Sequence, residues 1–272
     1  MKQAQQAIGI FDSGVGGLTI AKVLAATLPH EKIIYFGDTV HLPYGEKSAD
    51  VIQHFSKNIA QFLVQKQCKM IVIACNSASS YAFEHLKNSL PEPVILVNVI
   101  DPVVDKLGCF DLKKVGVIGT KATISSAVYS RKIKAKYPNL KHTELATPLF
   151  AKMIEEGFID NTISKEIIKS YLSQPELEAI DALILGCTHY PLISKEIDEF
   201  FESKVHLLDS PQLVVDHIKT ELERHQLLAQ TKAAQQPVFY VSLFTESFKQ
   251  TAQMFFGQNI ELIEHDLWKQ NK

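Results

Sequence analysis

Short apolar runs alternate along the chain with longer segments in which apolar residues recur every three or four positions. The run at 8–11 precedes helical spacing over 18–28, and the run at 70–74 precedes helical spacing over 78–90. This alternation of strands and helices predicts parallel sheets with right-handed crossover connections. We therefore expect an α/β fold.

The predicted strands are short and apolar, and glycine, proline or polar residues follow most of them. They cover residues 8–11, 33–36, 70–74, 94–99, 114–118, 182–185, 205–208, 238–242 and 260–263. A glutamine-rich connection at 226–236 is polar, and we expect it to be a surface loop.

Two predicted strands lead into a cysteine through the same pattern. Residues 70–80 read MIVIACNSASS and residues 182–192 read ALILGCTHYPL, so each apolar run ends in one small residue before Cys75 or Cys187. Side chains that can form hydrogen bonds follow both cysteines. Ligands of open α/β sheets bind outside the carboxyl ends of the strands, so we expect both thiols at a binding crevice.

The two halves of the chain show a further similarity. Ile8 and Val115 begin two glycine-interrupted apolar strands that are 107 residues apart, and the two cysteines are 112 residues apart. Nearly equal separations indicate an internal duplication. We expect a first lobe formed by residues 1–98 with 210–272, and a second lobe formed by residues 99–209.

Composition limits the class of partner. The chain has 272 residues, 46% of them hydrophobic and 21% charged, which suits two globular lobes of modest size. A net charge of −2 without a Lys/Arg-rich block argues against nucleic-acid binding and favours a small molecule. No apolar run approaches the ~18 residues of a membrane span, and the N-terminal residues lack a signal-peptide core, so we expect a cytoplasmic protein without membrane association. Its four cysteines show no CxxC spacing and are expected to be free thiols.

Cys75 and Cys187 both precede predicted helices, and this position suggests their chemistry. Unpaired backbone N–H groups at a helix N-terminus favour the thiolate, so we expect a lowered thiol pKa. Two such thiols on opposite sides of a substrate could remove a proton from one face of a carbon and return one to the other face, which inverts a stereocentre. Nothing in the sequence indicates a pyridoxal-phosphate site, so we expect no cofactor, and backbone N–H groups and hydroxyls would have to stabilise the carbanion.

The turn after the first predicted strand contains Asp12, Ser13 and three glycines. It lacks the full spacing of a dinucleotide-binding GxGxxG motif and the Lys-Ser/Thr ending of a phosphate loop. Asp12 either caps the following helix or accepts protons and holds an ammonium group near Cys75. His189 could play the same part beside Cys187.

Five motifs together resemble the cofactor-independent glutamate racemases: FDSGVGGLT at 11–19, PYG at 43–45, ACNSAS at 74–79, GTKAT at 119–123 and GCTHYPL at 186–192. The resemblance extends from the N-terminus to about residue 205. It implies two pseudosymmetric lobes, each with a mostly parallel sheet flanked by helices, and an active site between them. It also implies a homodimer that interconverts L-glutamate and D-glutamate for peptidoglycan synthesis, without a cofactor or a metal.

The same resemblance assigns roles to particular residues. Cys75 and Cys187 would exchange protons with the substrate, and Asp12, His189 and Glu155 would assist them, with Glu156 as the alternative to Glu155. The residues expected to bind glutamate are Asp12, Ser13, Pro43, Tyr44, Gly45, Asn76, Ser77, Thr120, Thr123, Thr188 and His189. Position 77 usually holds threonine in the family, and the serine found here keeps the hydroxyl.

Other functions fit parts of this pattern. A related aspartate or hydantoin racemase, or a maleate isomerase, would use the same two thiols, whereas a non-catalytic protein that binds dicarboxylates would need neither. A zinc site at Asp12, Cys75, Cys187 and His189 would lack the usual close cysteine spacing. A hydrolase based on Cys187 and His189 is disfavoured because residues at i and i+2 rarely face each other.

Overall fold

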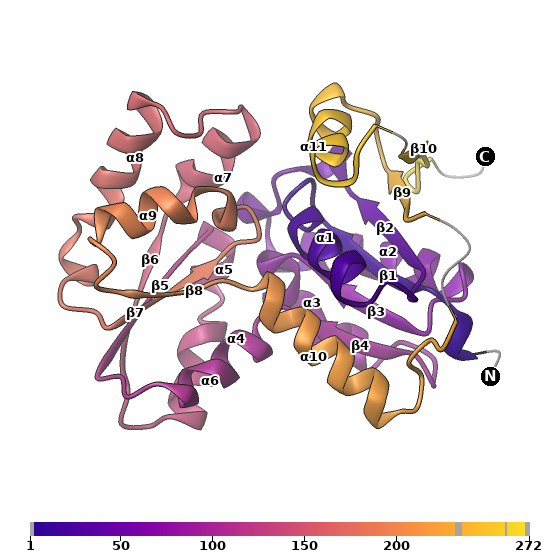
Figure 1. The fold of residues 1–272 in the computed structure, drawn as a ribbon, viewed down its shortest axis with the longest axis horizontal. Helices are drawn as coiled ribbons and strands as arrows, with labels where there is room; N and C mark the ends of the chain where they lie inside the picture. Colours follow the sequence, from indigo (N-terminus) through magenta and orange to yellow (C-terminus); the bar gives the residue numbers. More distant parts are fainter. Residues whose placement is uncertain (1–2, 232–235, 259, 270–272) are drawn as a thin grey trace.

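The computed structural model describes residues 3–231, 236–258 and 260–269, and its two lobes lie side by side (Figure 1). Each lobe has a parallel sheet with helices on both faces, so the α/β prediction is confirmed. Residues 232–235 of the predicted polar connection lie outside the described residues. Within the described ranges, no helix has both the length and the apolar composition needed to cross a lipid bilayer.

The first lobe is built on a six-stranded parallel sheet in the order β10-β9-β2-β1-β3-β4. Its strands are β1 (Ile8–Asp12), β2 (Ile33–Gly37), β3 (Met70–Ile73), β4 (Ile95–Asn98), β9 (Val238–Val241) and β10 (Glu261–Glu264). One face is covered by α1 (Leu18–Thr27), α10 (Pro211–Arg224) and α11 (Glu246–Phe256), and the other by α2 (Ala49–Gln65) and α3 (Asn76–Lys87). All of β1 is buried, as expected for an inner strand of a sheet that is covered on both faces.

The second lobe is built on a four-stranded parallel sheet in the order β6-β5-β7-β8. Its strands are β5 (Lys114–Gly119), β6 (Lys141–Ala146), β7 (Ala182–Gly186) and β8 (His206–Leu208). One face is covered by α4 (Asp101–Lys106) and α6 (Val128–Lys136), and the other by α7 (Pro148–Glu155), α8 (Thr162–Leu172) and α9 (Ser194–Phe200). The short helix α5 (Lys121–Ser125) contacts α3 of the first lobe.

Short 3-10 helices occupy several connections. They are η1 (Gln3–Gln5), η2 (Thr39–His41), η3 (Tyr44–Glu46), η4 (Leu107–Cys109), η5 (Pro175–Leu177) and η6 (Tyr190–Ile193). η3 follows β2 and contacts α5, so the connection after β2 reaches the second lobe. η6 begins three residues after Cys187 and separates β7 from α9.

The two sheets repeat one strand order. The series β2-β1-β3-β4 in the first sheet corresponds to β6-β5-β7-β8 in the second, and a cysteine follows the third strand of each series along the chain. This repetition supports the internal duplication that the sequence separations indicate. It places Cys75 and Cys187 at equivalent points of the two lobes.

Strand β6 has no counterpart among the predicted strands. It lies at one edge of the second sheet, its sequence KHTELA mixes charged and polar residues, and none of its residues is buried. An edge strand has a partner on one side only and commonly carries charged side chains. Strand β6 therefore cannot be predicted from apolar runs in the sequence.

Candidate active site

A narrow cavity lies where the carboxyl ends of the two sheets face each other. The lining combines residues that end or follow four strands, β1, β3, β5 and β7, with three residues of the connection after β2 and two residues of α7. These residues are Asp12, Ser13, Pro43, Tyr44, Gly45, Cys75, Asn76, Ser77, Thr120, Ala151, Glu155, Cys187, Thr188 and His189. The cavity is small, because the centre of a water molecule can move through only about 20 Å³ of it. Both cysteines therefore border a single small space.

The cavity brings together every residue of the expected site except Thr123. Oγ1 of Thr123 lies 3.0 Å from Oγ1 of Thr120, so this buried residue supports the cavity wall from behind. Glu155 lines the cavity and Glu156 does not, so the geometry distinguishes the two candidate carboxylates. Ala151 also lines the cavity, and this is not predictable from the sequence because a methyl group has no distinctive chemistry.

Cys75 stands between β3 and α3 in an extended conformation, with its side chain buried. Its Sγ lies 3.8 Å from Oγ of Ser13. Burial, followed by the negative charge of Asp12, raises the pKa of the Cys75 thiol far above its usual range, although the N–H of Ala78 in the first turn of α3 favours the thiolate. The expected lowering of the pKa is therefore wrong for Cys75, because desolvation outweighs the helix N-terminus.

Cys187 directly follows β7 and is also buried. Its Sγ lies 3.6 Å from Nδ1 of His189. The expectation that residues i and i+2 do not face each other is wrong at this point, because residues 187–189 form the turn between a strand and a 3-10 helix. The turn brings the imidazole back beside the sulfur.

His189 connects Cys187 to Glu155. Nε2 of His189 lies 2.9 Å from Oε1 of Glu155, the last residue of α7. Burial disfavours the charged imidazolium, but the contacts with Cys187 and Glu155 outweigh burial and raise the pKa of His189 well above its usual value. The imidazole can therefore keep a proton beside the sulfur of Cys187.

Asp12 lies at the end of β1 and is fully buried. Its Oδ2 accepts hydrogen bonds from the N–H groups of Gly14 and Gly17, at 3.0 and 3.1 Å, whereas its Oδ1 has no partner among the described residues. Burial raises the pKa of Asp12, and the charge of His189 and the backbone N–H groups oppose this shift. One oxygen of the carboxyl group thus fixes the turn while the other is free to accept a proton or a hydrogen bond.

Hydrogen-bonding groups from both lobes meet at the cavity. Oγ of Ser77 lies 2.9 Å from Oγ1 of Thr120, so a hydroxyl contact joins α3 to the residue before α5. Tyr129 donates a 2.7 Å hydrogen bond to Oδ1 of Asn76, and Nδ2 of Asn76 has no partner in the described part of the chain. Free donors of this kind suit the carboxylate of a small molecule.

Each cysteine of the cavity has an ionisable neighbour that could exchange protons with it. Asp12 raises the pKa of Cys75 through its charge, and His189 contacts Cys187. Over residues 3–231, 236–258 and 260–269, no group of three or more His, Cys, Asp or Glu side chains is placed to hold a metal ion. The zinc interpretation gains no geometric support.

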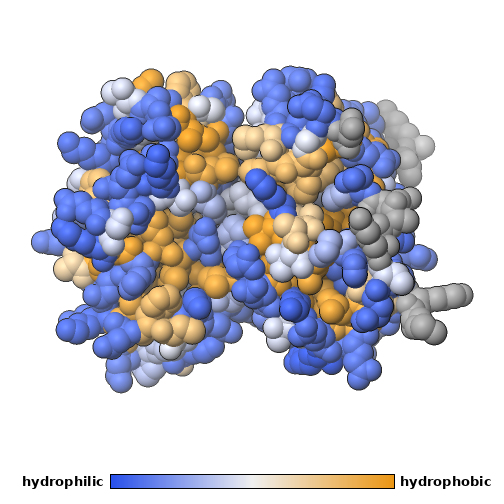
Figure 2. Space-filling model, viewed as in Figure 1, coloured by the Kyte–Doolittle hydropathy of each residue, from blue (hydrophilic) through white to orange (hydrophobic). Residues whose placement is uncertain are grey.

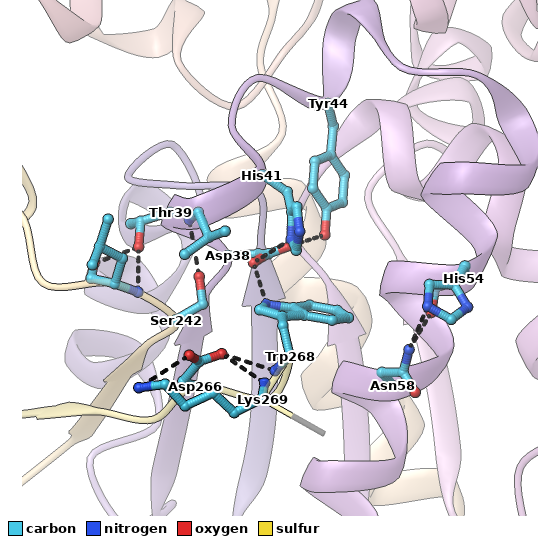
Figure 3. A network of polar contacts seen from close by, with 12 residues as sticks. Asp38, Thr39, His41, Tyr44, His54, Asn58, Ser242, Asp266, Trp268 and Lys269 are labelled. Carbon is cyan, nitrogen blue, oxygen red and sulfur yellow. Dashed lines mark hydrogen bonds and ion pairs between the residues drawn. The ribbon is translucent and has the colours of Figure 1, made fainter. Parts of the chain in front are cut away.

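Asp38 lies next to the cavity wall, although no role for this residue is expected from the sequence. It follows Gly37 at the end of β2, and its Oδ2 accepts a 2.6 Å hydrogen bond from the hydroxyl of Tyr44 (Figure 3). Its position two residues after the predicted strand 33–36 is the available signal, because Asp12, Cys75 and Cys187 also follow predicted strands closely.

Comparisons with known proteins show which family the chain resembles. The family model described as Asp/Glu/Hydantoin racemase matches residues 18–218. The glutamate racemase of Geobacter metallireducens is 40% identical over 253 residues, which cover 93% of each chain. The crystal structure of glutamate racemase from Francisella tularensis in complex with D-glutamate has a TM-score of 0.91 at 38% identity, covering 98% of this chain and 100% of that one. Glutamate racemase from Thermus thermophilus in complex with beta-chloro-D-alanine has a TM-score of 0.86 at 35% identity, covering 97% and 98% of the two chains.

Proposed function

The chain belongs to the Asp/Glu/Hydantoin racemase family and is an amino-acid racemase, and we propose that it interconverts L-glutamate and D-glutamate by direct proton transfer. The observation that carries the proposal is the position of Cys75 and Cys187, which follow strands of different sheets and line one cavity. Glutamate is favoured as the substrate because a relative of 40% identity is named for it.

The proposed reaction moves one proton from the α-carbon to one sulfur and another proton from the opposite sulfur to the α-carbon. A thiolate on one side takes the proton from the α-carbon, and the electron pair of that C–H bond stays on the carbon. The thiol on the opposite side then gives its proton to the other face. The first sulfur ends as a thiol and the second as a thiolate, so the protein is ready for the reverse reaction and no oxidant or reductant is needed.

We assign the starting charges from the surroundings of the two sulfurs. His189 lies 3.6 Å from Sγ of Cys187 and has a raised pKa, so its imidazole can hold a proton beside that sulfur. The raised pKa of Cys75 keeps that sulfur protonated. Cys187 then acts as the first base and Cys75 as the first acid. A thiolate that forms on Cys75 is strongly basic, which suits the weakly acidic α-proton.

The other cavity residues are proposed to hold the substrate. Nδ2 of Asn76 and the hydroxyls of Ser77 and Thr120 offer hydrogen bonds to carboxylates, and the free oxygen of Asp12 offers an acceptor to the ammonium group. Glu155 orients His189, and Thr123 supports Thr120. The remaining proposed contacts are Ser13, Pro43, Tyr44, Gly45 and Thr188.

Replacing each sulfur separately tests the two-base mechanism. We expect Cys75→Ser and Cys187→Ser each to lower racemisation by about 10²–10⁴-fold, the usual contribution of a positioned acid or base. Circular dichroism with each glutamate enantiomer measures the rate, and the exposed Cys109→Ser serves as the control. In deuterated water the label should enter chiefly the product enantiomer at early times. Full turnover by either sulfur variant would exclude the mechanism.

Substrate choice within the family needs its own assay. Incubating the parent protein with L-aspartate, a 5-substituted hydantoin and maleate, as well as with glutamate, separates the related activities. We expect conversion of glutamate to exceed conversion of the other three compounds. Faster inversion of aspartate or of the hydantoin would reassign the substrate and leave the two-thiol mechanism in place.

We further propose that two copies of the chain form a homodimer. Within each chain, one lobe would consist of residues 1–98 with 210–272 and the other of residues 99–209. Hydrophobic patches on both lobes support association (Figure 2). Exposed apolar residues around α7 and α8, and around α11, include Leu149, Phe158, Ile159, Ile163, Leu243, Phe244 and Met254. Light scattering after size-exclusion chromatography should give twice the chain mass.

The proposed product has an expected use in the cell. D-glutamate is a component of peptidoglycan, and we propose that this protein supplies it in the cytoplasm. Disrupting the gene should make growth depend on added D-glutamate. Normal cell-wall synthesis without that supplement would contradict this role while leaving the racemase activity untouched.

A further inference from the structure

Asp38 is a buried carboxylate that three side chains hold at once, although it does not line the cavity. Tyr44 donates its hydroxyl to Oδ2 at 2.6 Å, and Nε1 of Trp268 donates to Oδ1 at 3.1 Å (Figure 3). Nδ1 of His41 lies 2.9 Å from Oδ2 and 3.1 Å from Oδ1. Asp38 thus connects a residue of the cavity wall to a residue 230 positions further along the chain.

Aromatic packing fixes the same group of residues. His41 stacks on Phe55 with ring centroids 3.8 Å apart, and the edge of Trp268 meets His41 at 4.5 Å and Phe55 at 5.1 Å. Tyr44 packs on Phe55 at 5.7 Å. We call these five residues, Asp38, His41, Tyr44, Phe55 and Trp268, the Asp38 cluster.

Local hydrogen bonds hold Trp268 in this position. Oδ1 of Asp266 accepts the backbone N–H groups of Trp268 and Lys269, at 2.9 and 3.2 Å, and so forms a turn at 266–269. Leu267 and Trp268 both pack against the apolar core around α2 and α3. The segment is therefore anchored independently of its bond to Asp38.

A second set of hydrogen bonds joins the connection after β2 to the C-terminal part of the chain. Oγ of Ser242 accepts the N–H of Val40, and Oγ1 of Thr39 bonds to both the N–H and the carbonyl oxygen of Leu243. The connection that carries Tyr44 and Gly45 to the cavity is thus held from the C-terminal side at two places.

Tyr44 is a fixed donor in this arrangement. Burial, followed by the charge of Asp38, raises the pKa of Tyr44 well above its usual value, so its hydroxyl stays protonated and points at the carboxylate. Removing another donor from a buried, charged acceptor leaves that acceptor partly unsatisfied and frees it to move. Loss of the Trp268 N–H would therefore shift Asp38 and, with it, the hydroxyl of Tyr44.

We propose that Trp268 is a positioning residue, which acts through Asp38 to fix Tyr44 and Gly45 against the substrate. This role rests on the proposed function of the cavity, because it concerns how that site holds glutamate. Trp268 itself does not line the cavity. Its removal should therefore affect the binding of glutamate more than the proton transfers.

Three variants of the segment 266–269 separate positioning from general stability. Trp268→Phe keeps an aromatic ring and deletes only the indole N–H, whereas Trp268→Ala removes both. Leu267→Ala is the matched control, since it removes apolar contact from the same segment and leaves the bond to Asp38 intact. We expect the KM for glutamate to rise about threefold in Trp268→Phe and about tenfold in Trp268→Ala, with kcat changed less and Leu267→Ala close to the parent.

A double-variant cycle tests the route through Asp38. If Trp268 acts by holding Tyr44, then adding Trp268→Phe to Tyr44→Phe should change kcat/KM little beyond the effect of Tyr44→Phe alone. Fully additive effects would overturn the proposal. Equal rises in KM for Leu267→Ala and Trp268→Phe would also overturn it, because they would reflect a loosened segment without a specific bond.

The fluorescence of the protein provides an independent readout. Trp268 is the only tryptophan in the chain, so all indole emission comes from the Asp38 cluster. Adding D-glutamate to the Cys75→Ser protein should shift or quench this emission, with a saturation that Tyr44→Phe weakens. Normal racemisation by the parent without any fluorescence response would reject the positioning role and retain the racemase. Failure of the parent to racemise glutamate would instead reject the proposed function.

Discussion

The buried carboxyl group of Asp12 makes the stability of the protein depend on pH. Its carboxyl group is fully buried, and two backbone N–H groups satisfy only one of its oxygens. Burial raises the pKa of Asp12 in the folded protein, so the unfolded chain releases this proton more easily. Between the unfolded and the folded pKa the folded state binds more protons, and its stability falls as the pH rises.

Asp12→Asn is therefore expected to stabilise the protein at pH 7 while lowering racemisation. Removing one poorly compensated buried charge should raise the free energy of unfolding by about 1–3 kcal/mol. The gain over the parent should shrink as the pH falls and disappear below about 4, where Asp12 is neutral in both states. Urea unfolding across this pH range measures it. A variant less stable than the parent at pH 7 would mean that His189 and the backbone N–H groups outweigh burial.

The two cysteines outside the cavity differ in accessibility and should differ in reactivity. Cys109 is exposed, whereas burial raises the pKa of Cys68 to about 12. Alkylating agents react with the thiolate, so iodoacetamide at neutral pH should modify Cys109 first and leave Cys68 intact in the folded protein. Mass spectrometry of digested protein measures the modification. Equal rates at the two positions would show that the fold opens around Cys68.

Individual residues also show how far the sequence predicts the site. Cys75 and Cys187 are recognisable because each follows a buried strand and one small residue. The contact between Cys187 and His189 cannot be recognised in the sequence, because it depends on the backbone conformation of a turn. Asp38 is missed for a similar reason, because its importance lies in the direction of the Tyr44 hydroxyl.

The turn between β1 and α1 brings backbone unusually close to the second lobe. A methyl group at Gly16 would lie 2.6 Å from both Nδ1 of His189 and Oγ1 of Thr188. In the sequence, this glycine-rich turn lacks the pattern of a phosphate-binding loop, and its glycines are expected only to let the chain bend. The structure gives a different reason for this glycine, which is close approach to the residues beside Cys187.

Gly16→Ala is expected to displace His189 from the sulfur of Cys187. Small misplacements of catalytic groups can reduce rates by up to about 10²-fold, and we expect kcat to fall about 10- to 100-fold. Racemisation kinetics measure the loss, with Lys22→Ala on the exposed side of α1 as the control. Unchanged kcat would mean that the turn shifts as a whole without disturbing the imidazole.

Strands and helices are predictable where apolar spacing is strong and are missed where it is weak. The central strands β1, β3, β5 and β7 are buried on both faces and appear as apolar runs. The edge strand β6 does not. The expected surface loop at 226–236 is wrong for Ala229, which is buried and donates its N–H to Oε1 of Glu31 at 2.8 Å. A polar composition cannot reveal that a loop covers a buried carboxylate.

At the scale of the whole molecule, the two lobes share an apolar core. One continuous cluster of buried residues includes α1, α10 and α11 of the first lobe and reaches β5 and β7 of the second. Helix α4 contacts both α10 and α6, and so lies at the junction. Apolar periodicity identifies which face of a helix is buried but not which lobe covers it, so this sharing is not predictable from the sequence.

A buried ion pair joins distant parts of the first lobe. Nζ of Lys69 lies 2.6 Å from Oε2 of Glu31 and also donates to the carbonyl oxygens of Ala4 and Leu227. The pair therefore ties residues near the N-terminus to the segment after α10. Removing one partner of such a pair leaves an uncompensated buried charge.

Lys69→Met is accordingly expected to lower the free energy of unfolding by about 3–5 kcal/mol. Adding Glu31→Gln should recover part of the loss, because the glutamine is neutral and can still accept the N–H of Ala229. Urea denaturation measures both variants, with the exposed Lys57→Met as the control. Equal stability of Lys69→Met and the control would mean that water reaches Glu31 when the lysine is removed.

Within the cavity described between the lobes, the centre of a water molecule has only about 20 Å³ in which to move, so a bound amino acid would have little room to turn. We expect a site this narrow to widen before glutamate enters and again before the product leaves. If product release is slower than proton transfer, a bound substrate molecule is inverted several times before it leaves. The racemisation rate measured in solution then reports the rate of product release and not the rate of proton transfer.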